Sequence, residues 1–289
     1  MAVKFRLRAH LQALIGERHP WSSPAHLQQT AHYIGEQFSN IGLAVTTHDF
    51  EALGGSYRNV IGVAHPPSEL DQPVLPPLIV AAHYDTVLGS PGADDNGSAL
   101  AVLLDVAQRI KQTSLRRPVH FIAFCLQEEG LLGSQAYVAY LTETREPLHG
   151  AIILECVGYA RDEEGSQQIP PGVPIAVPTV GNFLAAIGNQ SSGSLTMAVE
   201  QAMRPHLPVV PLIVPGSGEL LPDTRRSDHT PFWEAGFPAV MLTDTANFRN
   251  PHYHQPTDTI ETLNLDFMST VADGVTAAIF CLTETQETS

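Results

Sequence analysis

Cysteine is scarce in this chain. Its 289 residues include three cysteines, Cys125, Cys156 and Cys281, and an odd, sparse set of this kind does not form the disulfide framework of a small secreted domain. Cys125 and Cys156 lie within apolar runs, so we expect both to be buried free thiols.

Positive charge is also scarce. Fifteen Lys and Arg residues stand against 30 Asp and Glu residues, which gives a formal net charge of −15. Nucleic acids and anionic membranes both require basic patches, so neither is expected as the main partner. The acidic balance is compatible with cationic ligands, including metal ions.

Long hydrophobic runs are absent as well. The first 20 residues are interrupted by charge and contain no continuous apolar segment or cleavage site of a secretory signal. No apolar run approaches the ~20 residues of a membrane span. We therefore expect a cytoplasmic protein, whose oligomeric state the sequence leaves open.

The chain does contain alternating helical and extended patterns, with 43% hydrophobic residues. Helical spacing or capping signals predict helices at about 3–15, 24–41, 97–111, 130–143, 192–205, 227–236 and 265–283, and extended patterns predict strands at about 43–50, 57–65, 76–84, 118–126, 150–155, 207–214 and 238–245. The segment 162–178 reads as a long loop. No linker divides the chain, so we expect one α/β domain over residues 1–289, with a mixed, largely parallel sheet and helices on both faces.

Acidic residues and histidines lie at or just beyond the ends of four of the predicted strands. In open α/β sheets, ligands bind beyond the carboxyl ends of the strands. The residues found there are His83 and Asp85; Asp94 and Asp95; Glu128 and Glu129; Glu155; and His252, His254 and Asp258. No lysine is among them.

Such a concentration of carboxylates needs a compensating cation, because like charges at short range raise one another's pKa sharply. A mixed set of histidines and carboxylates suits Zn²⁺. Two histidines and three carboxylates can serve two ions if one carboxylate bridges them, and paired ions roughly 3.5–4 Å apart are a known hydrolytic arrangement.

Six motifs in order, "HYD", "PGADDNGS", "EEGLLGS", "LE", "SDHTPFWEAGFPAV" and "HYHQPTDT", resemble the M28 family of di-zinc aminopeptidases over about 78–265. The resemblance implies a three-layer α/β/α fold with a central mixed, mostly parallel sheet. It also implies two zinc ions, with His83 and Glu155 on one, Glu129 and His254 on the other, and Asp95 bridging both.

The resemblance further implies a role for each remaining acid. Glu128 would be the general base that takes a proton from the metal-bridging water. Adjacent residues at a strand end point in divergent directions, so Glu129 can bind metal while Glu128 reaches that water. Asp85 would orient the imidazole of His83, and Asp258 would do the same for His254. Asp94 would support the turn at the helix start.

The leading hypothesis is therefore a zinc-dependent exopeptidase that removes N-terminal residues from peptides with a free N-terminus. Two alternatives share the fold: a glutaminyl-cyclase-like zinc acyltransferase and a non-catalytic binding domain. Two zinc ions per chain would favour the peptidase, one the cyclase and none the binding domain.

The "SDH" sequence at residues 227–229 has a different interpretation. No G-x-S-x-G elbow accompanies it, so a serine-hydrolase triad is not expected. Ser227 is instead predicted as a helix N-cap. The family resemblance places Asp228 and His229 near the site without a ligand role.

Overall fold

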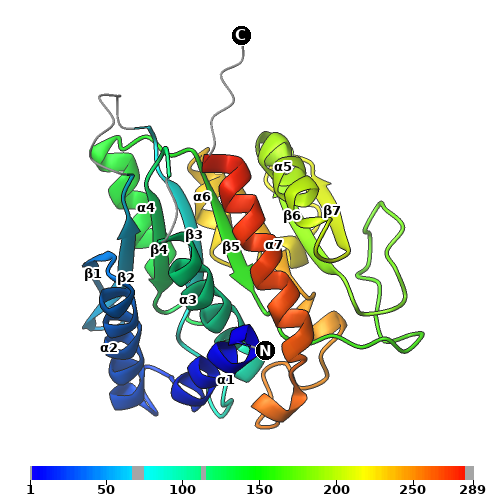
Figure 1. The fold of residues 1–289 in the computed structure, drawn as a ribbon, viewed down its shortest axis with the longest axis horizontal. Helices are drawn as coiled ribbons and strands as arrows, with labels where there is room; N and C mark the ends of the chain where they lie inside the picture. The colour runs from blue at the N-terminus through cyan, green and yellow to red at the C-terminus, as the bar shows by residue number, and fades with distance from the viewer. Residues whose placement is uncertain (1, 67–74, 112–114, 284–289) are drawn as a thin grey trace.

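The protein folds around one eight-stranded sheet (Figure 1). The computed structural model describes residues 2–66, 75–111 and 115–283. The strands are β1 (Ala44–Ala52), β2 (Gly55–Ala64), β3 (Leu78–His83), β4 (Val119–Phe124), β5 (Gly150–Glu155), β6 (Leu184–Asn189), β7 (Val209–Val214) and β8 (Ala239–Thr243). Their order across the sheet is β1-β2-β4-β3-β5-β8-β6-β7.

The sheet is mixed, with a parallel centre. Strands β4, β3, β5 and β8 run parallel to one another, so their carboxyl ends lie at one edge of the sheet. The β1–β2 hairpin joins β4 in antiparallel fashion, and β6 is antiparallel to β8 but parallel to β7. The predicted sheet is therefore confirmed.

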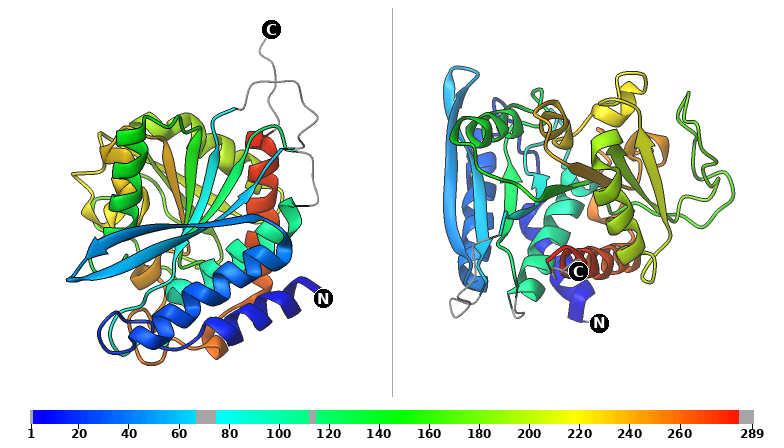
Figure 2. Two further views of the ribbon diagram at one scale, coloured as in Figure 1. Left: turned by 90° about the vertical axis from the view of Figure 1, so that its left-hand side faces the viewer. Right: turned by 90° about the horizontal axis from the view of Figure 1, so that it is seen from above.

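Helices cover both faces of the sheet, as Figure 2 shows. The helices are α1 (Ala2–Leu14), α2 (Pro24–Ile41), α3 (Ala99–Ile110), α4 (Leu132–Thr144), α5 (Gly193–Met203), α6 (His229–Glu234) and α7 (Leu265–Thr283). Helices α1, α2, α3, α5 and α7 form one layer, while α4 and α6 pack together on the opposite face. This is the three-layer α/β/α arrangement predicted from the sequence.

Each central strand is buried on both faces. Val80 and Phe121 face the layer that contains α3 and α7, whereas Ile79 and Ile122 belong to the apolar cluster on the other side. Successive strand residues point to opposite faces, so a continuous apolar run fills both cores. Cys125 and Cys156 are buried, as expected, and Cys281 is exposed.

Helix α7 differs from the sequence expectation in one respect. It is the only helix in the described ranges that is long and apolar enough to cross a membrane by length and composition, with a mean hydropathy of 1.5. It packs against α3 and α5 (Figure 1), and Val271, Val275 and Ile279 are fully buried. Its apolar composition is therefore that of a core helix.

Strand β6 was missed by the sequence analysis. Its sequence, Leu-Ala-Ala-Ile-Gly-Asn, has little of the β-branched or aromatic content that marks strands. Tertiary contacts specify it instead, because it pairs with β8 on one side and β7 on the other. The predicted loop at 162–178 is confirmed as irregular chain.

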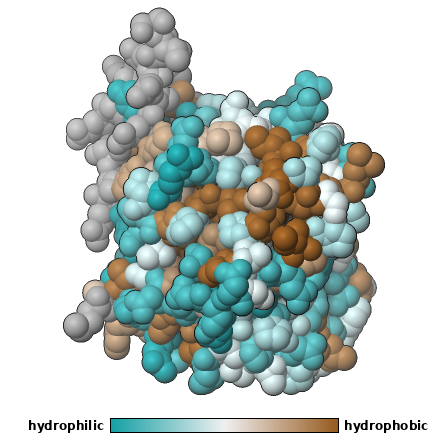
Figure 3. Space-filling model, turned by 90° about the vertical axis from the view of Figure 1, so that its right-hand side faces the viewer, coloured by the Kyte–Doolittle hydropathy of each residue, from teal (hydrophilic) through white to brown (hydrophobic). Residues whose placement is uncertain are grey.

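Apolar side chains gather on the face beside edge strand β7 (Figure 3). Among the exposed apolar residues, Ile213 belongs to β7 itself, and Ile169 and Leu220 lie in irregular chain before and after it. Pro211 lies within β7 and removes one backbone donor from that strand.

Candidate metal centre

The predicted ligands come together at the carboxyl edge of the parallel strands. His83 is the last residue of β3, Glu155 is the last residue of β5, and Glu128 lies four residues beyond the end of β4. Asp95 comes from the turn Ala93–Ser98 before α3. His254 comes from the loop that follows β8.

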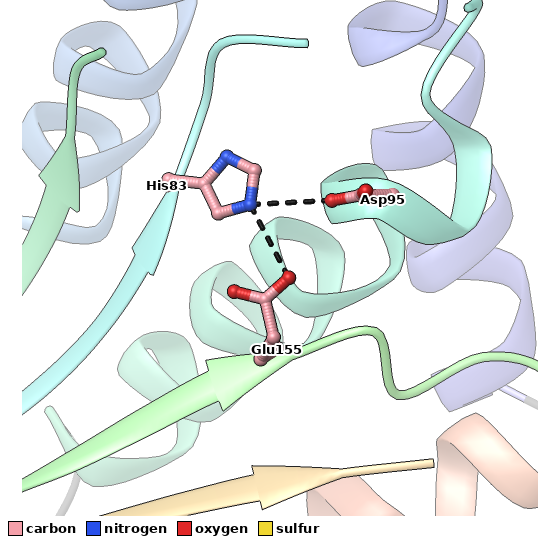
Figure 4. Close-up of side chains that lie close together, drawn as sticks. All are labelled: His83, Asp95 and Glu155. Carbon is pink, nitrogen blue, oxygen red and sulfur yellow. Dashed lines mark hydrogen bonds and ion pairs between the residues drawn. The ribbon is translucent and has the colours of Figure 1, made fainter. Parts of the chain in front are cut away.

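His83, Asp95 and Glu155 form a buried triad (Figure 4). The Nε2 atom of His83 lies 3.2 Å from Oδ1 of Asp95 and 3.4 Å from Oε1 of Glu155. The three side chains point toward one another from three separate elements, so they offer one nitrogen and two carboxylate ligands to a single ion.

Asp95, Glu128 and His254 form a second triad. The Nε2 atom of His254 lies 3.0 Å from Oδ2 of Asp95 and 3.4 Å from Oε1 of Glu128. Asp95 thus faces one histidine with each of its two oxygens. This is the geometry expected of a carboxylate shared between two cations.

The Glu128–Glu129 pair differs from the expectation. The carboxylate beside Asp95 and His254 is that of Glu128, whereas Oε1 of Glu129 lies 3.3 Å from Nε2 of His19. The two side chains do diverge, as predicted, but Glu128 rather than Glu129 lies in the triad. The turn after β4 determines which acid points inward, and sequence spacing does not reveal it.

Two further carboxylates, those of Asp85 and Asp258, hold the backbone of triad residues without joining a triad. Asp85 accepts the backbone N–H groups of Gln127 at 3.0 Å and Glu128 at 2.9 Å, and it lies 3.5 Å from Nδ1 of His83. It therefore contacts His83 as predicted and also fixes the backbone that carries Glu128.

Asp258 plays a different part from the predicted one. It accepts the backbone N–H groups of Asp94 at 2.8 Å and Asp95 at 3.1 Å, and no contact of its carboxylate with His254 is found. The prediction that Asp258 orients His254 is wrong, because its carboxylate holds the turn that carries Asp95.

Asp94 is a supporting residue, as expected, and does not enter either triad. Its carboxylate accepts hydrogen bonds from the N–H of Gly158 at 2.9 Å and from the amide of Asn250 at 2.7 Å. It joins the turn before α3 to the segments after β5 and β8.

Electrostatics reveal how closely these groups interact. Burial and the neighbouring Asp95 raise the pKa of Glu128 to about 8. Burial alone would lower the pKa of His254, but hydrogen bonds to Asp95 and Glu128 raise it to about 10. Burial would also raise the pKa of Asp95, yet His254 and His83 lower it below its ordinary range. Without a metal, protonated imidazoles supply the positive charge that the carboxylates require.

The residues present fit a pair of metal ions. The buried atoms Oδ1 of Asp95, Oε1 of Glu128 and Nε2 of His254 lie 3.0–3.4 Å from one another's side chains or from His83, yet none of them makes a hydrogen bond of good geometry, although buried polar atoms almost always do. Imidazole nitrogens and carboxylate oxygens are the donor types that zinc accepts. The poor hydrogen-bond geometry of these atoms and the donor set therefore both point to cations.

A small cavity opens beside Glu155. Its volume is about 90 Å³, and apolar side chains of three neighbouring strands line it: Ile187 of β6, Leu212 of β7 and Met241 of β8. Arg226, a residue that the sequence did not single out, also lines this cavity.

Arg226 and Tyr253 form a bridge beside this cavity. Arg226 donates to Oδ1 of Asn247 at 2.7 Å and to the hydroxyl of Tyr253 at 3.0 Å. The ring of Tyr253 stacks on that of His254, with 3.8 Å between centroids. The imidazole of His254, a candidate ligand, is thus held in place by the ring of Tyr253.

The "SDH" residues have three separate structural roles. The hydroxyl of Ser227 donates to Oε2 of Glu155 at 2.5 Å, so the predicted N-cap role is wrong; no side-chain cap is formed at the start of α6. Asp228 accepts the hydroxyl of Ser134. His229 lies against Trp233 and contacts the carbonyl of Thr224 at 2.7 Å.

His252 lies in the loop after β8, as expected for a loop residue, and its Nδ1 lies 2.9 Å from the hydroxyl of Thr257. Asn250 and Gln127 were missed by the sequence analysis. Amide side chains have no distinctive spacing, so only their contacts with Asp94 and with the carbonyl of Arg226 reveal them.

Comparison with known proteins reveals a family match. The family model described as peptidase family M28 matches residues 59–279. The uncharacterized protein YfbL of Escherichia coli is 33% identical over 271 residues, covering 88% of this chain and 80% of YfbL. Aminopeptidase YwaD of Bacillus subtilis is 32% identical over 235 residues, covering 77% of this chain and 44% of YwaD.

Solved structures agree in fold. The zinc aminopeptidase BSAP from Bacillus subtilis superposes with a TM-score of 0.61 at 27% identity, covering 82% of this chain and 52% of that chain. A glutaminyl cyclase from Porphyromonas gingivalis has a TM-score of 0.68 at 17% identity, which shows the fold alone. The chain spans about half the length of the curated aminopeptidases it matches.

Proposed function

The chain belongs to peptidase family M28, and on that premise we propose that it is a zinc-dependent aminopeptidase that releases N-terminal residues from peptides. The observation that carries the proposal is the placement of Asp95, whose two oxygens lie 3.2 Å and 3.0 Å from the Nε2 atoms of His83 and His254. The names of the related aminopeptidases support the same reaction class.

The proposed ligand set follows the two triads. His83 and Glu155 would hold one zinc ion, Glu128 and His254 the other, and Asp95 would bridge them. This differs from the family-based assignment at one position, since Glu128 takes the place first given to Glu129. Zinc ions bound here would polarise the scissile carbonyl and lower the pKa of a bound water.

The group that would take a proton from the bound water changes with this ligand set. A carboxylate that completes a ligand triad is not free to act as a base, so we move this role away from Glu128. Gln127 carries an amide, which does not take up a proton. Glu129 is the remaining carboxylate of the turn, and its contact with Nε2 of His19 holds it in place. With this ligand set, Glu129 is the candidate for proton transfer; with the family-based assignment, in which Glu129 is the ligand, Glu128 keeps that role, and the two assignments predict different zinc contents for Glu128→Gln.

The remaining groups would bind and orient the substrate. A free α-amine is positively charged, and the carboxylates of the centre attract it. The cavity beside Glu155 would receive the side chain of the N-terminal residue. Its walls, formed by Ile187, Leu212 and Met241, favour an uncharged apolar side chain because a charged one would lose its hydration there.

Hydrolysis of aminoacyl chromogenic substrates tests this proposal. The zinc-loaded protein should cleave leucyl and methionyl anilides, should leave their N-acetylated forms intact, and should lose activity in a chelator that added zinc reverses. Equal cleavage of the acetylated forms would contradict aminopeptidase action. Cyclisation of glutaminyl peptides without anilide cleavage would favour the cyclase-like alternative, which shares the fold.

A further inference from the structure

Arg18 lies in the connection between α1 and α2, outside the region that the family model matches, and it is fully buried. Buried arginines ordinarily pair with a carboxylate. In the described part of the chain, no carboxylate lies within ion-pair distance of Arg18. Its guanidinium instead donates to five backbone carbonyl groups, those of Leu14, Gly16, Tyr84, Pro91 and Gly92, at 2.7–3.1 Å.

These five acceptors belong to three segments that meet behind the metal centre. Leu14 and Gly16 lie at the end of α1, Tyr84 lies between His83 and Asp85, and Pro91 and Gly92 begin the turn that carries Asp95. The backbone of Arg18 adds two contacts with Thr86, through the Oγ1 atom and the N–H of that residue. One side chain thus connects the end of β3 to the turn of the shared ligand.

The turn is shaped around this guanidinium. Gly92 has a φ of +64°, and a Cβ atom there would lie 2.6 Å from Nη2 of Arg18 and 2.6 Å from the carbonyl oxygen of Asp95. Only glycine accommodates both the left-handed backbone and the close approach. The glycine of "PGADD" is therefore explained by its left-handed backbone and by the close approach of three groups, of which Cγ2 of Thr86 would lie nearest to a Cβ atom, followed by Arg18 and Asp95.

The charge of Arg18 lies among the acids that support the ligands. Asp85 and Asp258 are its strongest electrostatic neighbours, followed by Asp95 and Glu128. Asp85 holds the backbone of Glu128, and Asp258 holds the backbone of Asp95. A buried cation at this place offsets part of the repulsion among these carboxylates, because opposite charges attract strongly where water is excluded.

We propose that Arg18 is a positioning residue of the metal centre: through its five carbonyl contacts and its buried charge, it fixes the Gly92–Asp95 turn against the end of β3, so that Asp95 can reach both ions. The inference rests on the two-ion centre of the proposed function. It assigns a part in metal binding to the N-terminal segment, which supplies no residue of either triad.

Zinc affinity, measured by competition with a chromophoric chelator, tests the inference without reference to activity. Arg18→Met should weaken binding of both ions at least tenfold, since both depend on Asp95. Arg18→Lys keeps the charge, but a single ammonium group cannot reach five carbonyls, so its loss should be intermediate. The control is Arg117→Met. Arg117 is also buried and donates to a carbonyl, that of Pro76, but it lies at the opposite edge of the sheet.

The zinc affinities of these variants can each contradict the proposed role of Arg18. Wild-type affinity in Arg18→Met, or a loss no larger than that of Arg117→Met, would overturn the role. If Arg18→Met does not fold, Arg18→Lys decides, and wild-type affinity in that variant would overturn the need for the guanidinium. A wild-type protein that binds no zinc would contradict the proposed function instead, so the two failures are distinguishable.

Discussion

Asp95 is the residue on which the centre depends, because each of its carboxylate oxygens faces a different histidine. The neighbouring acid, Asp94, can be tolerated beside it because its own carboxylate is occupied by Gly158 and Asn250. Two adjacent acids thus have separate roles, one as a shared ligand and one as a structural acceptor.

The Glu128–Glu129 pair gives the first prediction. If Glu128 is a ligand, Glu128→Gln should lower zinc content from two ions to one and reduce turnover at least about a hundredfold, because loss of a partner that only orients a ligand costs about 10–100-fold and loss of the ligand itself should cost more. Zinc content and kcat should be measured on the same preparation. Two retained ions with no turnover would return Glu128 to the role of base.

Glu129→Gln is the matched variant and gives the second prediction. It should retain both ions, since Glu129 contacts His19 rather than the triads, and it should lower kcat by 10²–10⁴-fold, the range for loss of general acid–base catalysis. Near-wild-type turnover of leucyl anilide in this variant would remove Glu129 from proton transfer.

His229 gives a prediction about pH. Burial lowers its pKa to about 4, from an ordinary value of 6.5. Between these values the unfolded chain takes up a proton that the folded protein does not, so stability is present above pH 6.5 and is lost as pH falls toward 4. The loss is about 3 kcal/mol.

Urea unfolding of the metal-free protein at pH 7 and pH 4.5 checks this prediction. His229→Gln keeps a donor for the carbonyl of Thr224 but does not titrate, so the difference in stability between the two pH values should shrink in the variant. An unchanged difference would show that other groups dominate acid unfolding.

The sequence predicted His83, Asp95, Glu155 and His254 because each of them follows a strand or lies in a motif of fixed spacing. It did not predict that Glu128 rather than Glu129 lies beside His254, or that Asp258 holds the backbone of Asp95, because backbone turns decide which way neighbouring acids point. It did not reveal Arg18, whose partners are backbone carbonyls and leave no pattern in the sequence.

At the level of elements, the sheet places the centre and its neighbouring cavity. Parallel β3, β4 and β5 bring their carboxyl ends together, which the alternation of predicted strands and helices along the sequence indicated. Strand β6 escaped prediction because Ala and Gly dominate it, yet it supplies Ile187 to the cavity wall. Pairing with β8 and β7, rather than intrinsic propensity, makes it a strand.

The cavity wall gives a prediction about specificity. Leu212→Phe should fill part of the about 90 Å³ beside Glu155 and lower kcat/KM for leucyl relative to alanyl substrates by about tenfold, the range for a change of one or two methylene groups in a pocket. Ile213→Phe is the control, because Ile213 is the next residue of β7 and is 41% exposed. Equal effects of the two changes would contradict the assignment of the cavity.

At the level of the whole molecule, the metal centre explains part of the excess of acidic residues over basic ones. Carboxylates from segments between β3 and α7 converge on one small volume, where only cations make their convergence favourable. Metal ions that bind the folded chain should therefore stabilise it as well as activate it.

Thermal unfolding tests this coupling between metal and fold. Zinc at one hundred times its dissociation constant should add about 2.7 kcal/mol to the free energy of unfolding, so the Tm should rise with zinc and fall in chelator. In Asp95→Ala the rise should be absent. A Tm that does not respond to zinc in the wild-type chain would contradict a built metal site.

The number of zinc ions bound per chain, in the wild type and in Asp95→Ala, tests the central claim most directly. The account predicts two ions per wild-type chain and none at stoichiometric occupancy in Asp95→Ala, because both triads lose their shared carboxylate together. A variant that keeps one ion at full occupancy, or a wild-type chain that binds only one, would contradict a two-ion centre bridged by Asp95.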